Sequence, residues 1–246
     1  DAGLDDGLKL LDSSVRFPAA LRHLLKGHTF KDNILVPMVT VLTLFRDFAV
    51  RRGHEPSIKK CNVFNPLHLP EPETSLHLKY DKGNLKLVDA TGKPVYGAQA
   101  HPFSQEKVEM PLVEDWDKFV DRSQIYEDDV LFHTDAFQVL TEIAVSQSSA
   151  AASIETDHAY RELLELDGAL QLALRWMDHC TGSPSLPMSV ESIQWYSDQV
   201  VSQVRLIGHG VRNNVGRCDL HLLSVDEKLV VSIEGVNVVG LTGTTA

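Results

Sequence analysis

Three side chains have the types and spacing that acid–base chemistry needs: His28, Asp167 and Gln171. A histidine titrates near neutral pH and suits the removal of a proton. A carboxyl group in an apolar pocket has its pKa raised by burial and then stays protonated as an acid. Asp167 and Gln171 are four residues apart, so on a helix they share one face. The sequence therefore offers a base, an acid and a polar partner for the acid.

His28 lies in a polar loop shortly before a long apolar run that opens at Pro37. Proline is favoured in the first turn of a helix. The run is apolar almost all round the helix it would form, which predicts a buried helix, and Arg51, Arg52 and Gly53 suit its end. We expect His28 to lie next to the N-terminus of this buried helix. A histidine in an exposed loop is the alternative.

Asp167 opens a second apolar run, which extends to His179 and is closed by a turn at residues 181–184. The periodicity predicts a helix that starts at Asp167. Aspartate is also a preferred N-cap, and a helix N-terminus favours a carboxylate for purely structural reasons. From these residues alone, a helix cap and a functional acid are both open for Asp167.

Composition limits the class of protein. Hydrophobic residues make up 43% and charged residues 23%, which is ordinary for a globular protein. A net charge of −11 disfavours binding to nucleic acid. No apolar run is long enough to span a membrane, and the N-terminus is no signal peptide. The three cysteines are widely spaced and predict free thiols in a reducing, cytoplasmic compartment. Nucleotide and metal motifs are absent, so we expect no cofactor.

The order of elements predicts an α+β chain in two similar halves. Residues 1–100 contain the first buried helix and then about four short alternating segments, separated by turns such as the one at residues 81–84. Residues 101–124 break this pattern and are predicted to be a linker with a short helix at Trp116–Val120. Residues 125–246 repeat the combination of a buried helix and Val- and Ile-rich strands.

Two motifs resemble those of a known family. Leu25, His28 and Pro37 fit L-x-x-H-x-x-x-G-x-x-x-x-P, although Asp32 stands where Gly is expected. The segment Leu166–Gln171 fits L-D-x-x-x-Q. In this order they are similar to the signatures of the dehydratase domains of polyketide and fatty-acid synthases. The chain most resembles the dehydratase domain of the polyketide synthase-like polyunsaturated fatty acid synthases.

A third segment, Leu131–Gln138, resembles the family's G-P-x-F-Q segment and more closely its L-F-H-G-x-x-F-Q form. Two departures stand out. Thr134 and Asp135 replace the usual Gly-Pro, and Glu162 and Leu163 stand where His-Pro is expected before L-D.

The resemblance implies a double hotdog, in which two antiparallel sheets each wrap around a central buried helix. The halves would be an N-terminal hotdog (1–100), a linker (101–124) and a C-terminal hotdog (125–246). It also implies a lyase that removes water from 3-hydroxyacyl thioesters on an acyl carrier protein to give enoyl thioesters. His28 and Asp167 would face each other across the seam, with Gln171 bonded to Asp167 or to the substrate hydroxyl. Amides around Pro37 and Met38 would bind the thioester carbonyl.

The implied partners are an acyl carrier protein domain, neighbouring synthase domains and a second copy in a homodimer. No cofactor is implied, because the substrate arrives on a phosphopantetheine arm. One run of cations has two possible interpretations, a basic patch that binds the carrier protein or a solvated helix end. It comprises Arg46, Arg51, Arg52, Lys59 and Lys60. Four apolar residues either line an acyl tunnel or belong to the core: Met38, Phe45, Leu170 and Trp176.

Rival functions remain at this level. One is a catalytically silent pseudo-dehydratase that scaffolds a megasynthase, which the departures from the motifs favour. Others are a hotdog enoyl isomerase, thioesterase or product-template cyclase. An isomerase would use the same histidine and aspartate, and a thioesterase would carry a carboxylate on the central helix to activate water. A Ser-His-Asp hydrolase is disfavoured because there is no G-x-S-x-G.

Overall fold

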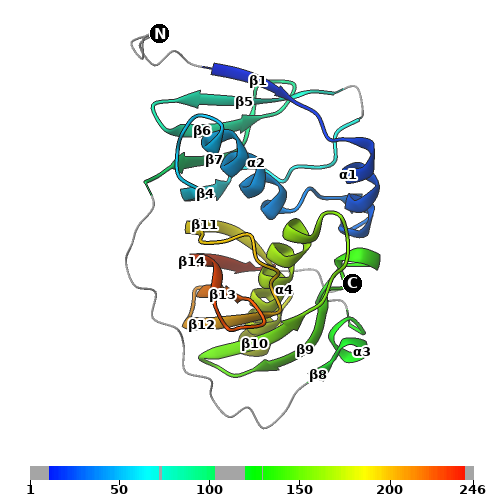
Figure 1. Cartoon of the computed structure of the whole chain (residues 1–246). Coiled ribbons are helices and arrows are strands. Elements are labelled where there is room, and N and C mark those ends of the chain that lie inside the picture. Colours follow the sequence, from blue (N-terminus) through cyan, green and yellow to red (C-terminus); the bar gives the residue numbers. More distant parts are fainter. Residues whose placement is uncertain (1–10, 72–73, 103–119, 129, 242–246) are drawn as a thin grey trace.

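Twelve antiparallel strands form one sheet, and the two long helices α2 and α4 pack against it (Figure 1). The computed structural model describes residues 11–71, 74–102, 120–128 and 130–241. Within these ranges the strand order is β1-β5-β6-β7-β4-β11-β14-β13-β12-β10-β9-β8. The expected Trp116–Val120 helix falls almost wholly outside the described residues. None of the described helices is long and apolar enough to cross a lipid bilayer.

The first half forms around helix α2 (Met38–Val50), which begins directly after Pro37 as predicted. Its neighbours follow the expected alternation, and the buried side of β5 consists of Leu76, Leu78 and Tyr80. The other elements are β1 (Leu11–Val15), α1 (Ala19–Leu24), β2 (Thr29–Phe30), β3 (Asn33–Ile34), β4 (Ser57–Val63), β5 (Leu76–Asp81), β6 (Asn84–Val88) and β7 (Pro94–Ala100).

The second half forms around helix α4 (Arg161–Thr181), on which every residue from Leu163 to Met177 is buried. The other elements are β8 (Val120–Asp121), α3 (Arg122–Ile125), β9 (Leu140–Val145), β10 (Ser149–Ile154), β11 (Ser185–Trp195), β12 (Gln203–Arg212), β13 (Val215–Leu223) and β14 (Leu229–Gly240). Strands β9 to β14 all contact α4. A sheet around one buried helix, formed twice, is the predicted double-hotdog arrangement.

Helix α4 begins at Arg161, six residues earlier than the sequence predicted. The prediction was wrong because Arg161, Glu162 and Glu165 make the first turn look like a polar loop, although Leu163 and Leu164 between them are buried. Asp167 therefore lies in the interior of the helix. The N-cap interpretation of Asp167 is excluded, because a residue in the second turn does not cap the first four amides.

The strands of the two halves join into the one sheet where β4 meets β11. Strand β4 pairs with β11 in antiparallel register, for example Ile58 with Ile193 and Cys61 with Val190. Helices α2 and α4 also contact each other, and one apolar core is continuous through both halves. The seam between the halves is thus bonded along the backbone and packed by the helices. It supplies a fixed frame for side chains that come from both sides.

Candidate active site

A short backbone bridge joins the His28 loop of the first half to the His133 loop of the second. His28 and His133 form an isolated antiparallel β-bridge, and the amide of Thr134 donates to the carbonyl of Gly27 over 2.9 Å. The approach requires glycine, because a Cβ at position 27 would stand 2.6 Å from the carbonyl oxygen of Thr134. Backbone pairing therefore brings together two side chains about a hundred residues apart.

His28 is buried and held in one orientation. Its Nδ1 donates to the carbonyl of Leu35 over 2.9 Å, so the neutral ring carries its lone pair on Nε2. The ring also packs edge-on against Phe132 and lies close to Phe137. Burial lowers the pKa of His28 from 6.5 to about 4, although the nearby carboxylate of Asp167 acts in the opposite direction. His28 is therefore a neutral base at pH 7.

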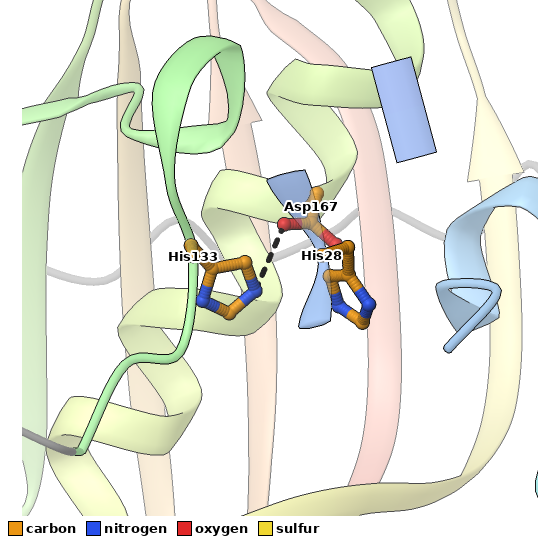
Figure 2. A group of neighbouring side chains, drawn as sticks. All are labelled: His28, His133 and Asp167. Carbon is orange, nitrogen blue, oxygen red and sulfur yellow. Dashed lines mark ion pairs between the residues drawn. The ribbon is translucent and has the colours of Figure 1, made fainter. Parts of the chain in front are cut away.

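Asp167 lies beside the rings of His28 and His133, which contact each other edge-on (Figure 2). Its Oδ2 accepts from Gln171 Nε2 over 2.8 Å and lies 3.3 Å from His133 Nε2. Burial acts to raise the pKa of this carboxyl, but the combined effect of His133, His28 and Gln171 lowers it below its usual value. The expectation that burial alone keeps Asp167 protonated was therefore wrong.

Gln171 and Tyr126 form a chain of hydrogen bonds behind the carboxylate. Gln171 donates to Asp167 and to the carbonyl of Phe137, and its Oε1 accepts from the hydroxyl of Tyr126 over 2.6 Å. That hydroxyl in turn accepts from the amide of Leu140. Every donor of the Gln171 amide is used, which fixes the side chain and, through it, the carboxylate of Asp167.

A mostly apolar cavity of about 120 Å³ is lined by His28, His133, Asp167 and Gln171. Pro37 and Met38, predicted to bind substrate, lie on its wall at the start of α2, whose first turn has no side-chain cap. The first amides of a helix lack intrahelical partners and carry positive potential. Phe64 and Met188 also line the cavity and are exposed hydrophobic side chains, so they mark its mouth.

The residues considered for an acyl tunnel divide into two pairs. Met38 and Leu170 line the cavity, whereas Phe45 and Trp176 are fully buried core residues away from its wall. A larger cavity of about 580 Å³ lies where α2 ends and α4 begins. None of the predicted site residues lines that larger cavity, so the small one is the chemically relevant site.

In the cation run Arg46 is partly buried, and both Arg46 and Arg52 contact partners within the protein. Arg46 bonds to Asp47 and Glu162 and lies over the ring of Trp195, and Arg52 lies over Phe48. Glu162, which stands where the family has histidine, is thus used in an ion pair far from the cavity.

Two residues that depart from the family motifs, Asp32 and Asp135, have positive φ angles. Asp32, which stands where Gly is expected, has a φ of 63° in the β2–β3 turn, a conformation that aspartate tolerates. Asp135, which replaces Pro, has a φ of 53°. Proline cannot adopt this angle. The loop that carries His133 therefore has a course that the Gly-Pro form does not allow.

Sequence reasoning missed two residues of the site, His133 and Tyr126. The signal for His133 was present, because it is the histidine of the L-F-H segment. Tyr126 lies in an irregular segment before that motif and had no sequence signal. Among the described residues, His28, His133 and Asp167 are also the one set that offers three possible metal ligands, with ligand atoms within 4.8 Å of one another.

Comparison with known proteins agrees with this architecture. The family model for the polyketide synthase dehydratase N-terminal domain matches residues 112–244, more than half of the chain. This stretch includes His133, Asp167 and Gln171 but not His28. No curated protein matches the sequence.

Solved structures match over nearly the whole chain. The dehydratase domain of a mycocerosic acid synthase-like polyketide synthase has 15% identity and a TM-score of 0.77, covering 96% of this chain and 91% of that one. GphF dehydratase 1 has 16% identity and a TM-score of 0.76, with 98% and 97% covered. The PpsC dehydratase domain from Mycobacterium tuberculosis, in complex with C12:1-CoA, has 16% identity and a TM-score of 0.75, with 97% and 96% covered. With the matched sequence and the shared double-hotdog fold, the chain belongs to the polyketide synthase dehydratase family.

Proposed function

We propose that the chain dehydrates 3-hydroxyacyl thioesters to enoyl thioesters, as a hydro-lyase that uses no cofactor. One observation carries this proposal: a neutral histidine from one half and a carboxylate from the other converge in one buried apolar cavity. Elimination of water needs a base for the Cα proton and an acid for the β-hydroxyl. A single cavity formed by both halves offers both groups to one substrate.

The base in this proposal is His28 Nε2, which takes the proton from Cα. Negative charge then develops on the thioester carbonyl, next to the amides around Met38 at the start of α2. The acid is one proton shared by Asp167 and His133, which lie 3.3 Å apart. It passes to the β-hydroxyl, and the C–O bond breaks to release water. Transfer of the proton from His28 back to the pair restores the starting state.

The departures from the family motifs do not weaken this site. A silent scaffold has no need of a buried network in which Tyr126, Gln171 and Asp167 are bonded in series. Such a network costs free energy wherever a partner is missing, so its complete form supports a working site.

The thioester class is supported by the apolar lining of the cavity and by the acyl-CoA bound in the PpsC structure. We infer that the acyl group arrives on an acyl carrier protein within a larger synthase, and the L-F-H segment favours the polyunsaturated fatty acid type. The carrier would dock at the mouth near Phe64 and Met188. The Arg46–Arg52 end of α2 lies at the opposite end of that helix from the cavity and is disfavoured as the docking site.

The test is turnover of a 3-hydroxyacyl pantetheine thioester, followed by the enoyl product. We expect product with the wild type and a loss of about 100-fold or more with His28→Ala and with Asp167→Asn, since acid–base groups contribute 10²–10⁴-fold. His209→Ala is the matched control, because His209 pairs with Asp219 on the surface, outside the cavity.

Two outcomes overturn the proposal. One is a folded wild type that gives no product at several chain lengths, which favours the scaffold. The other is unchanged turnover in His28→Ala. Conversion of an enoyl substrate without loss of water from the 3-hydroxyacyl form would instead indicate an isomerase.

A further inference from the structure

We propose that the site binds one zinc ion through His28, His133 and Asp167, and that the ion inhibits the dehydration. The three side chains come from two loops and from α4, and all are buried (Figure 2). Two imidazoles and one carboxylate, with a fourth position open, form a common ligand set of accessible zinc sites in proteins. Inhibition rests on the proposed function, whereas binding of the ion does not.

The spacing of the three ligand atoms already approaches that of a zinc site. Zinc bonds to nitrogen and oxygen are about 2.0–2.2 Å long, which places neighbouring ligand atoms about 3.3–3.6 Å apart. His133 Nε2 and Asp167 Oδ2 are already 3.3 Å apart, and one ligand atom of each of the three residues lies within 4.8 Å of the others. A separation at that upper bound must shorten by about 1 Å to reach these tetrahedral spacings.

The surrounding contacts prepare the ligand atoms. The bond from His28 Nδ1 to the carbonyl of Leu35 directs the lone pair of Nε2 away from that carbonyl. Gln171 fixes the carboxylate from behind. Such outer contacts, on histidine and carboxylate alike, are typical of metal ligands in proteins. Nδ1 of His133 is buried and has no partner among the described residues, so the ring proton can reside there and leave Nε2 free.

The fourth position would face the cavity, because all three ligands lie on its wall. An ion can enter past Phe64 and Met188 and keep one water molecule. Two imidazole nitrogens select zinc over magnesium, which prefers oxygen ligands. A bound ion would occupy the lone pair of His28 that takes the Cα proton. It would also displace the proton shared by Asp167 and His133.

The experiment is calorimetric titration of the chelator-treated protein with zinc chloride, with magnesium chloride as a control. We expect one zinc ion per chain, no heat from magnesium, and a rise in unfolding temperature with zinc. His133→Phe keeps a ring that stacks on Phe132 and should weaken zinc binding by about 100-fold or more, since the loss of a ligand exceeds the 10–100-fold effect of outer contacts. Asp167→Asn removes the charge at nearly constant shape and tests the same point if His133→Phe does not fold.

His209→Ala is the matched control, since it removes an exposed histidine that also faces an aspartate. It should leave zinc affinity unchanged. The proposal is overturned by absence of zinc binding, by equal binding in His133→Phe and Asp167→Asn, or by loss of binding in His209→Ala, which would indicate adventitious surface histidines.

Turnover measured in parallel separates this proposal from the function. Zinc binding without any turnover of metal-free protein leaves the metal site standing and contradicts the dehydratase. Turnover of metal-free protein without zinc binding supports the dehydratase and contradicts the metal site. Turnover that zinc abolishes and a chelator restores supports both.

Discussion

Replacing Gly27 by alanine tests whether the bridge between the two loops sets the reaction geometry. The added Cβ would stand 2.6 Å from the carbonyl oxygen of Thr134, and ordinary contact begins at 3.4 Å. The obstacle is backbone rather than a flexible side chain, so the two loops must separate by about 0.8 Å. Since His28 directly follows Gly27 and His133 directly precedes Thr134, their rings would move apart with the backbone.

A displacement of about 1 Å in an active site can lower the rate by about 100-fold. We therefore expect Gly27→Ala to lower kcat/KM by about two orders of magnitude, measured as enoyl thioester formation below the unfolding transition. Overpacking should also lower the free energy of unfolding by about 1–3 kcal/mol. Denaturant titration gives this second value and defines a temperature at which the variant is folded.

Gly208→Ala is the matched control for this loss of stability. Its Cβ would stand 2.5 Å from the ring of Trp176, far along α4 from Asp167, so it should lower the stability to a similar extent. It should leave kcat/KM nearly unchanged. Normal activity in Gly27→Ala, or an equal loss of activity in Gly208→Ala, would refute the idea that the bridge positions the two rings.

Four further predictions follow from single contacts. Tyr126→Phe removes the hydroxyl that donates to Gln171 Oε1 and should lower the free energy of unfolding by about 1–3 kcal/mol in denaturant titrations. Unchanged stability would contradict the hydrogen-bond network. In a pH–rate profile, the acid limb of kcat/KM should lie near pH 4 and not near 6.5, because His28 becomes protonated only below its lowered pKa of about 4. Burial raises the pKa of Glu165 to about 7, so its contribution to stability is present below pH 4.5 and is lost as the pH rises through 7. That loss should be about 2 kcal/mol after allowance for solvent screening, and Glu165→Gln should remove it. Phe64→Ala should raise KM by about 10-fold with little change in kcat, because uniform binding at the mouth is removed; an equal fall in kcat would argue against a mouth at Phe64.

The local parts of the fold could be predicted because short-range patterns specify them. The alternation that ends at Tyr80 predicted β5, and Pro37 predicted the start of α2. The start of α4 could not be predicted, since its first residues are charged and only tertiary packing buries Leu163 and Leu164. The pairing of β4 with β11 had no local signal, because the paired residues are more than a hundred positions apart.

The candidate site was predictable only in part, for the same reason. His28, Asp167 and Gln171 carry motif spacing, and Pro37 and Met38 follow from the helix start. The role of His133 depends on a backbone bridge that no spacing reveals. The lowering of the Asp167 pKa likewise depends on ring nitrogens from two remote loops, so reasoning from burial alone gave the wrong direction.

The antiparallel pairing of β4 with β11 also governs what happens if the halves are made as separate chains. Each half would then present one of these strands as a bare edge, with unsatisfied amides and carbonyls along it. Such an edge recruits any extended chain, so a lone half is expected to self-associate. When the two halves are produced together, pairing of β4 with β11 would compete with self-association of each half. Reconstitution from fragments would then depend on how fast the two strands pair.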